Sequence, residues 1–278
     1  MPEITAALVK QLRDATNVSM MECKKALIET NGDTEAATRL LRERGMAVAA
    51  KRASKEANEG LMASAFSEDR KTVSLVEVNC ETDFVARNET FKRFVDEVAQ
   101  RALGTDADLA EEMKGDLLSR ISEIGENLRI RRHARYVLEK PGILASYIHL
   151  GGKVGVLVEL GCEKPATSDQ DAVRELARDL TLHVAACNPR YLSSDDIPED
   201  VLKTEKEIYA KQVEDKPPQI VEKIVDGKIK KFYAEVCLPD QGFVKEPKQA
   251  VRNLLAEAGK KISDVLTIRR FLRYQLGE

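Results

Sequence analysis

The sequence predicts an α+β protein with an N-terminal three-helix module, two duplicated units of β-sheet and helix, and an inserted helical hairpin. Three observations lead to this prediction. Helical periodicity fills the first 45 residues, a strand-strand-helix pattern occurs twice at a constant offset, and a long helical stretch interrupts the second copy. A chain of 278 residues is long enough for two or three such units.

Residues 1–45 predict three short helices. Ser19 and Glu22 have the spacing of a capping box at the start of the second helix. Gly45 follows the last apolar residues of the third helix and predicts its end. The charged segment after it has no strong apolar stripe, so we interpret it as a linker. We assign residues 1–55 to the N-terminal module with this linker.

An internal repeat organises the rest of the chain. The segment GLMASAF at Gly60 matches GILASYI at Gly142, 82 residues later, and this offset holds through the next strand and helix. The final strands also match, LRIRRHARYVLE at Leu128 and LTIRRFLRYQLGE at Leu266, but they lie 138 residues apart. The second copy therefore carries 56 extra residues, the difference between the two offsets. We assign residues 56–140 to core subdomain N, and residues 141–192 and 237–278 to core subdomain C.

The extra residues predict a helical hairpin. Apolar residues at three- and four-residue spacing run from Glu199 to Glu214 and from Pro218 to Val236, and the turn EDKPPQ lies between them. Narrow stripes of this kind are typical of a short antiparallel coiled coil. We assign residues 193–236 to this insertion and expect it to project from the core as an arm that makes contacts.

Composition and charge argue against several classes of protein. The net charge of −3 is unlike that of a general nucleic-acid binder, which usually has a basic surface. The five cysteines are widely spaced without a Cys-x-x-Cys pair, so they predict neither a disulfide scaffold nor a zinc site. The sequence has no signal-peptide pattern and no segment near the roughly 20 apolar residues of a membrane span. We therefore expect a cytoplasmic protein.

Sequence motifs for enzyme chemistry are missing. The chain has no Gly-rich phosphate loop, no Gly-x-Ser-x-Gly and no metal-spaced histidine cluster, so we expect no catalytic residue, metal or cofactor. His183 lies on an apolar helix and is either a core or an interface histidine. Cys80 has a twin at Cys162 in the repeat, which favours a small buried residue over a nucleophile. The basic strand RIRRHAR, Arg129 to Arg135, leaves a structural or RNA-associated interaction module as the alternative function.

The two copies diverge in the loop after their second strand. The first copy has TDFVARN where the second has KPATSDQ, which is ordinary polar turn chemistry. Phe84 at this place either folds back into the core or is an exposed anchor for a partner. Met20 and Met21 raise a similar question, because adjacent helical positions point about 100° apart and cannot both face a small core. We expect one of the two methionines to be exposed.

Two segments resemble the signature sequences of the bacterial elongation factor Ts family. They are LVKQLRDATNVSMMECKKALIETNGD and EVNCETDFVAR, and the segments HVAACNPRYL and KIVDGKIKKF agree as well. The family commonly has Thr-Gly-Ala-Gly-Met-Met-Asp where this chain has TNVSMME, from Thr16 to Glu22. Asn17 then stands in place of the first glycine, and asparagine can still adopt a left-handed turn.

The resemblance implies a ubiquitin-associated-like N-terminal module, a core of two related subdomains and a coiled-coil arm. It also implies guanine nucleotide exchange on the GTPase elongation factor Tu, by disturbing its Mg²⁺ and phosphate site, without direct binding of nucleic acid or membrane. A homodimer within a heterotetramer is left open as the assembly. The residues nominated for partner contact are Thr82, Asp83, Phe84 and Val85, as the Mg²⁺ dislocation loop, together with Arg13, Met20, Met21 and His183.

Overall fold

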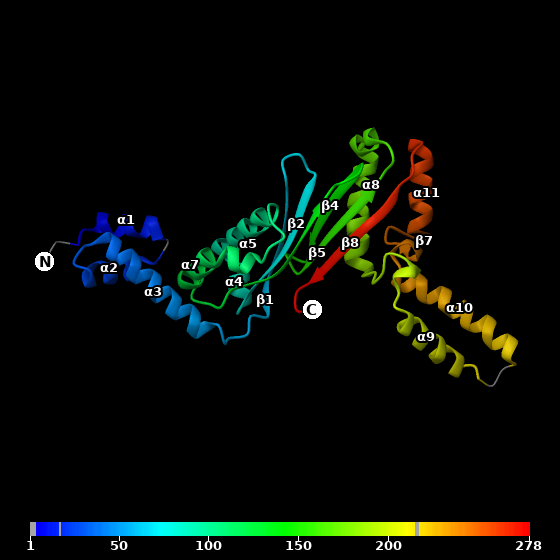
Figure 1. Ribbon diagram of the computed structural model, residues 1–278, viewed down its shortest axis with the longest axis horizontal. Helices are drawn as coiled ribbons and strands as arrows, with labels where there is room; N and C mark the ends of the chain where they lie inside the picture. Colours follow the sequence, from blue (N-terminus) through cyan, green and yellow to red (C-terminus); the bar gives the residue numbers. More distant parts are fainter. Residues whose placement is uncertain (1–3, 17, 215–216) are drawn as a thin grey trace.

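The chain forms an elongated molecule with helices at one end, two β-sheets in the middle and a helical arm at the other end (Figure 1). The structure, a computed structural model, describes residues 4–16, 18–214 and 217–278. Helices and strands both make up a large part of it, which confirms the predicted α+β class. None of the helices within the described ranges is both long and apolar enough to cross a membrane.

Three helices form the N-terminal module: α1 (Ala6–Thr16), α2 (Met20–Glu29) and α3 (Thr34–Arg52). They enclose a small core around Leu12, Cys23 and Leu27, all nearly or fully buried. Ser19 caps α2, since its side chain accepts a hydrogen bond from the amide of Glu22. The turn predicted at Asn17 lies outside the described residues.

Helix α3 does not end at Gly45, so the prediction of a helix stop followed by a linker is wrong. Gly45 is buried where α3 crosses α7 (Lys114–Ile124), and a β-carbon added to it would lie 3.4 Å from Cβ of Ser122. The glycine therefore permits a close helix crossing. One turn later Ala49 joins the core of the first half of the chain, so tertiary packing carries the helix on to Arg52.

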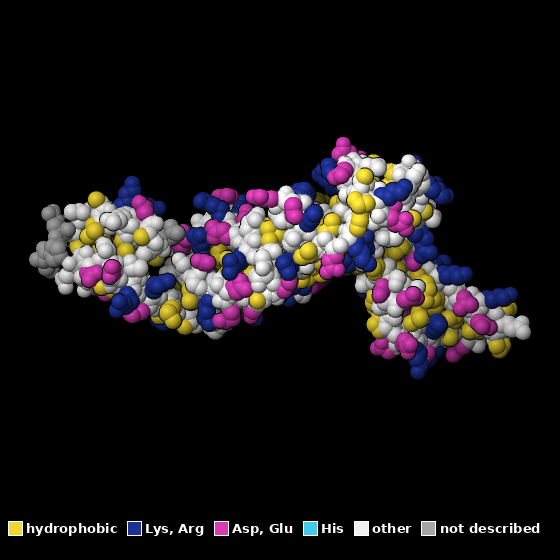
Figure 2. Space-filling model, turned by 45° about the horizontal axis from the view of Figure 1, so that its top comes forward, with side chains coloured by type: hydrophobic (Ala, Val, Ile, Leu, Met, Phe, Trp, Pro, Cys, Tyr) yellow, Lys and Arg dark blue, Asp and Glu magenta, His cyan; other side chains and the backbone are white. Residues whose placement is uncertain are grey.

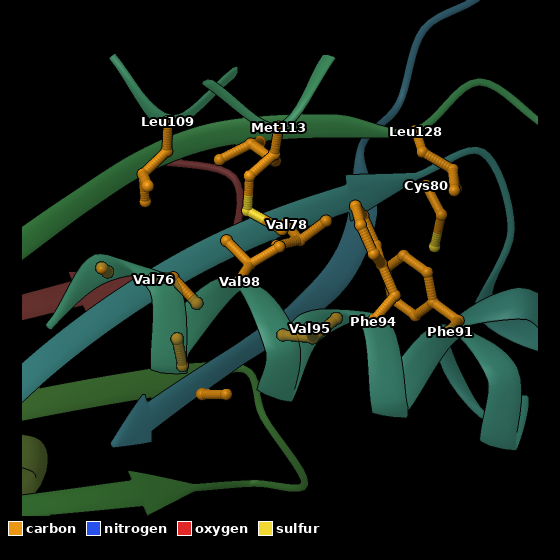
Figure 3. Close-up of a cluster of buried hydrophobic side chains, with 14 of the residues drawn as sticks. Val76, Val78, Cys80, Phe91, Phe94, Val95, Val98, Leu109, Met113 and Leu128 are labelled. Carbon is orange, nitrogen blue, oxygen red and sulfur yellow. The ribbon is translucent and has the colours of Figure 1, made fainter. Parts of the chain in front are cut away.

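The first half of the core is an antiparallel sheet in the order β1-β2-β3, formed by Glu59–Phe66, Thr72–Cys80 and Arg129–Val137. Helix α5 (Glu89–Ala102) packs its apolar face on this sheet, with α4 (Asp83–Ala86), α6 (Leu109–Glu112) and α7 around it. Figure 3 shows Phe91 and Phe94 of α5 lying against Val78 and Cys80 of β2. This core fixes the end of β2, where the Thr82–Val85 segment begins.

The second half repeats this arrangement. Its antiparallel sheet has the order β4-β5-β8, formed by Gly142–His149, Val154–Gly161 and Thr267–Gln275. Helices α8 (Asp171–Cys187) and α11 (Val251–Ile262) take the places of α5 and α7. The shorter elements of this half are the 3₁₀ turns η1 (Pro165–Asp169), η2 (Ser194–Asp196) and η3 (Leu238–Asp240), and the strands β6 (Gly242–Phe243) and β7 (Glu246–Ala250).

The two halves meet about an approximate two-fold axis. The hydroxyls of Ser64 and Ser146, 82 residues apart, lie 2.9 Å from each other, and a residue that touches its own repeat counterpart must lie near such an axis. The guanidinium of Arg132 stacks 4.1 Å from the ring centre of Tyr274, and Arg270 stacks 4.0 Å from that of Tyr136. These two stacks exchange under the 138-residue offset, so the symmetry extends to side chains.

The helical insertion forms an arm of two antiparallel helices, α9 (Glu199–Lys211) and α10 (Pro218–Val236). Its base is apolar, with Ile197, Phe232 and Val236 buried, and the arm extends away from the sheets (Figure 1). Figure 2 shows hydrophobic side chains among charged ones along its surface. The helices begin where the sequence placed them, while the division of the chain into domains at 55, 140, 192 and 236 stays a prediction.

Candidate functional site

The Thr82–Val85 segment is the start of a one-turn helix, α4, where the sequence predicted a loop. Thr82 has extended backbone angles and caps the helix, since its Oγ1 accepts a hydrogen bond from the amide of Val85 at 3.3 Å. The amide of Arg87 closes the turn on the carbonyl of Asp83 at 3.2 Å. The segment thus has a defined backbone instead of the open turn expected for a strand-to-helix connection.

Two carboxylates hold the start of α4 in place. Glu126 accepts hydrogen bonds from the amides of Glu81 and Thr82, at 3.1 and 3.0 Å, and from the hydroxyl of Thr82 at 2.6 Å. Glu81 in turn accepts from the amide of Asn127 at 2.6 Å and pairs with Arg52 of α3 at 3.1 Å. The segment is therefore tied to the loop before β3 and to the end of α3.

Phe84 points into solvent at the tip of α4. Its side chain is 79% exposed, the most exposed large apolar side chain among the described residues. The alternative that it folds back into the core does not hold in this structure. Its neighbours have that role instead, because Val85 packs on the core of the first half and Ala86 is buried. An exposed aromatic ring on a fixed backbone is a typical anchor for a protein partner.

Asp83 lies beside Phe84 with its carboxylate in a solvated ion pair. Oδ2 of Asp83 is 2.9 Å from a guanidinium nitrogen of Arg87, one helical turn later. The side chain of Arg87 is largely exposed and that of Asp83 nearly half exposed, so the pair contributes at most about 1 kcal/mol and can exchange for another partner. The carboxylate is therefore available to a cationic or hydrogen-bonding group that approaches along Phe84.

The second half holds its equivalent loop in the same way but exposes only the small apolar residues Pro165 and Ala166 there, where the first half has Asp83 and Phe84. Asp264 accepts hydrogen bonds from the amides of Glu163 and Lys164, at 3.2 and 3.1 Å, and from the hydroxyl of Thr167 at 2.5 Å. The Thr167 hydrogen bond and these amides hold the pKa of Asp264 at about 2. Since Asp264 is 138 residues from Glu126, the support is common to both halves and the exposed phenylalanine is particular to the first.

The N-terminal module exposes three of the other predicted contact residues, Met20, Met21 and Arg13. Met20 and Met21, in the first turn of α2, are 40% and 64% exposed, so both face solvent where the sequence predicted only one. Arg13 is exposed near the end of α1. Ile28, at the other end of α2, is also exposed and was not singled out from the sequence. These exposed side chains give the module an apolar surface with an adaptable methionine pair.

His183 is buried on α8 and has no surface for a direct partner contact. Its Nε2 lies 2.9 Å from Oε1 of Gln241, and its Nδ1 accepts a hydrogen bond from the amide of Val244 at 3.1 Å. These two bonds assign the proton to Nε2, and burial lowers the pKa of the imidazole below its ordinary value. Of the two roles weighed for His183, the structure supports the core one, in which it positions the loop after the arm.

Cys80 has the structural role that its repeat twin indicated. Its thiol donates a hydrogen bond to the carbonyl of Thr82 at 3.2 Å, and that of Cys162 donates to the carbonyl of Lys164 at 3.3 Å. Burial, together with the charges of Glu126 and Glu59, raises the pKa of Cys80 to about 12. A thiol with so high a pKa is not a nucleophile at neutral pH.

Two arginines of the basic strand RIRRHAR form ion pairs with a buried carboxylate. Arg131 and Arg132 donate to the two oxygens of Glu77 at 2.9 and 2.6 Å, and Glu77 is fully buried on β2. The second half repeats the cluster, in which Arg269 and Arg270 donate to Glu159 at 3.1 and 2.6 Å. Because a buried carboxylate needs such partners, these arginines have a structural function in both halves.

The sequence reasoning missed two residues that support the site, Glu126 and Arg52. A signal for Glu126 was present, since the 138-residue match can be extended backwards from Leu128 and then pairs Glu126 with Asp264. Arg52 could not be found in this way, because the segment that contains it has no counterpart in the second half.

Comparison with known proteins gives concordant matches. A family model described as elongation factor TS matches residues 81–278. Elongation factor Ts of Clostridium perfringens (strain 13 / Type A) is 45% identical over 288 residues, which span 99% of this chain and 93% of the relative. Elongation factor Ts of Clostridium novyi (strain NT) is 43% identical with the same coverage of both chains. Elongation factor Ts of Halothermothrix orenii is 43% identical over 285 residues, which span 97% of this chain and 91% of the relative.

Proposed function

The chain belongs to the elongation factor Ts family and has a role in translation elongation, and within that role we propose that it is the guanine nucleotide exchange factor of elongation factor Tu. It binds the GTPase in the cytoplasm and promotes release of GDP without any covalent chemistry of its own. The observation that carries this proposal is Phe84, 79% exposed on a helix whose start is fixed by Glu126 and Glu81.

The mechanism follows from thermodynamic linkage. A factor that binds the nucleotide-free GTPase more tightly than the GDP-bound one must weaken GDP binding by the same ratio. The interactions that differ between the two states therefore have to lie near the nucleotide. Mg²⁺ bridges the phosphates in GTPases, so a contact that displaces the groups around it reduces the hold on GDP.

Phe84 and Asp83 have different roles in weakening the binding of GDP. The ring of Phe84 inserts into an apolar pocket of the GTPase beside the Mg²⁺ site, where its exposed surface becomes buried. The carboxylate of Asp83 leaves its solvated pair with Arg87 and competes for the groups that orient the Mg²⁺ shell. Thr82 and Val85 hold α4 in position: Thr82 caps the helix, and Val85 packs on the core of the first half.

The N-terminal module supplies a second contact to the same partner. Met20, Met21 and Arg13 face solvent on α1 and α2, and the module is joined to the α4 region by the continuous helix α3. Two contacts on one rigid connection strengthen each other, because the second forms at a high effective concentration once the first has formed. In this proposal the arm of α9 and α10 makes a further contact, and the exchange step does not require it.

The proposal is tested by the rate at which elongation factor Tu releases a fluorescent GDP analogue in stopped-flow mixing with excess unlabelled GDP. The release rate should rise with the concentration of this chain and then saturate, and the stimulation should shrink when EDTA removes Mg²⁺. In a pull-down, excess GDP with Mg²⁺ should weaken the complex, as linkage requires. A release rate that does not depend on the chain would refute the proposal.

The pull-down repeated at increasing salt concentrations separates this function from the alternative of an RNA-associated module. Binding to phosphates weakens steeply with salt, whereas an interface anchored by Phe84 and the methionines should change little. The structural use of Arg131 and Arg132 already gives that alternative less support.

A further inference from the structure

Helices α7 and α11 are repeat counterparts whose surfaces can be compared residue by residue. The 138-residue offset pairs Lys114–Ile124 with residues 252–262 without a gap. Both helices end at a residue in the left-handed conformation, Gly125 with φ 82° and Ser263 with φ 55°. In each case the next residue is the acid that holds the loop after the second strand of its sheet. The two helices can therefore be compared for which part of the chain packs on each of them.

In the first half, helix α3 covers this surface. Gly45 lies where α3 crosses α7 at Ser122, Ala49 packs into the core cluster to which Ile121 of α7 also belongs, and Arg52 pairs with Glu81 at 3.1 Å. These three positions of α3 are spaced four and three residues apart, so they form one stripe along the helix. A helix with small side chains and a terminal arginine thus fills the groove beside α7.

In the second half, the equivalent surface is an open groove of about 900 Å³. Its lining includes Leu255, Ala256, Lys260 and Val265, which correspond to Leu117, Leu118, Ser122 and Asn127. Val265 is 53% exposed, an apolar side chain where the first half has an asparagine. Figure 1 places α11 on the opposite side of the core from α3, so the chain's own N-terminal module does not cover it.

One of the charged residues that line this groove, Glu163, differs from its repeat counterpart in its partners. Glu163 is the counterpart of Glu81, and its backbone amide is held by Asp264 in the same way. Glu81 has an ion pair with Arg52, whereas within the described ranges the carboxylate of Glu163 has no salt bridge. The groove therefore offers apolar side chains on its floor, the basic residues Lys164 and Lys260 in its lining, and a carboxylate without an ion pair at the place where α3 brings an arginine in the first half.

We infer that the α11 groove is a docking site for an α-helix of a protein partner, which lies on α11 as α3 lies on α7. The partner helix presents small or apolar side chains four residues apart to Leu255, Ala256 and Val265. About one turn later it carries an arginine or lysine that pairs with Glu163. This site is separate from the Phe84 surface, and the inference does not depend on the proposed exchange function.

A peptide of the chain's own residues 34–55 is a suitable probe, because it contains the stripe of Gly45, Ala49 and Arg52. Fluorescence anisotropy of the labelled peptide with the full chain should show saturable binding at concentrations up to about 1 mM, as expected for a small interface. Glu163→Arg should weaken this binding about twofold to fivefold, the range of an exposed ion pair. A peptide with Arg52→Glu should bind the Glu163→Arg chain better than it binds the unchanged chain.

Matched variants on the same helix control for general effects. Ala256→Glu puts a charge on the groove floor and should weaken binding more than tenfold, whereas Asn253→Glu and Glu257→Arg lie on exposed positions outside the groove and should leave it unchanged. All variants should keep the melting temperature of the unchanged chain, since the substituted side chains are exposed.

Two results would overturn the inference. One is the lack of saturable binding over this concentration range. The other is binding that neither Ala256→Glu nor Glu163→Arg changes, because the peptide would then occupy the α7 groove in place of α3.

Discussion

Truncation of Phe84 to alanine distinguishes a partner anchor from a core residue. Loss of an anchor slows catalysed GDP release at an unchanged melting temperature, whereas loss of a core side chain lowers the folding stability. Complete burial of a phenylalanine side chain contributes about 1.5–3 kcal/mol. Since 79% of the side chain is still exposed, about four-fifths of this, roughly 1.2–2.4 kcal/mol, is available on contact with the partner. If the contact forms in the transition state for exchange, catalysed GDP release should slow about eightfold to sixtyfold, at 1.36 kcal/mol for each factor of ten.

The measurement is the stimulated release rate of a fluorescent GDP analogue from elongation factor Tu, with the melting temperature of each variant measured in parallel. Phe84→Ala should leave the melting temperature nearly unchanged, as for other exposed positions. Phe91→Ala is the matched control, because Phe91 is fully buried and its truncation should cost about 3–5 kcal/mol of folding stability. A Phe84→Ala chain that exchanges nucleotide at the normal rate would show that the ring is not an anchor.

Three further predictions concern other parts of the chain. Met20→Asp combined with Met21→Asp should weaken the complex with elongation factor Tu at least tenfold, about 1.4 kcal/mol, without a change in melting temperature; equal affinity in a titration would rule out this contact. Burial lowers the pKa of His183, so the free energy of unfolding should fall as the pH drops below about 6.5, where the unfolded chain binds the proton more readily. Urea unfolding across this range should show a smaller pH dependence in His183→Gln, and an identical dependence would contradict the buried neutral imidazole. Replacement of residues 206–231 by a short Gly-rich linker should leave the core cooperatively folded, because the first half has no arm; a broad, non-cooperative thermal transition would refute this.

Much of the fold could be predicted because duplication doubles the information in the sequence. The match between Gly60 and Gly142 identified the strand pairs without any propensity argument, and the change of offset at Leu128 located the insertion. The hairpin helices were predicted to begin at Glu199 and Pro218, where the structure begins them, since a charged first turn and a proline at the first position are strong local signals.

The errors occurred where tertiary contacts outweigh local signals. Gly45 has the features of a helix stop, but a neighbouring helix makes its missing side chain an advantage for packing. Thr82 was read as part of a loop because a capped helix of a single turn is too short to produce a period. The hydrogen bonds of His183 come from residues 58 and 61 positions away, which no local pattern reveals.

Under the proposed function, the position of Phe84 shows how one half of a duplicated fold can acquire a partner contact that the other half lacks. Glu126 and Asp264 fix the starts of the two loops alike, so a change of a few residues beyond them alters the exposed tip without a cost to the fold. A ring on a backbone that is already ordered loses little conformational entropy on binding.

The first half adds one connection that the second lacks. Arg52 ties the end of α3 to Glu81, directly before α4. The exposed methionines at one end of the N-terminal module and Phe84 at the start of the core are thereby joined through a single helix that crosses α7 at Gly45. Binding of the module to a partner then restricts where Phe84 can lie, and this favours the second contact by raising its effective concentration. On this argument Arg52→Ala, although Arg52 is not itself one of the proposed contact residues, should weaken the cooperation between the two contacts more than it weakens either contact alone.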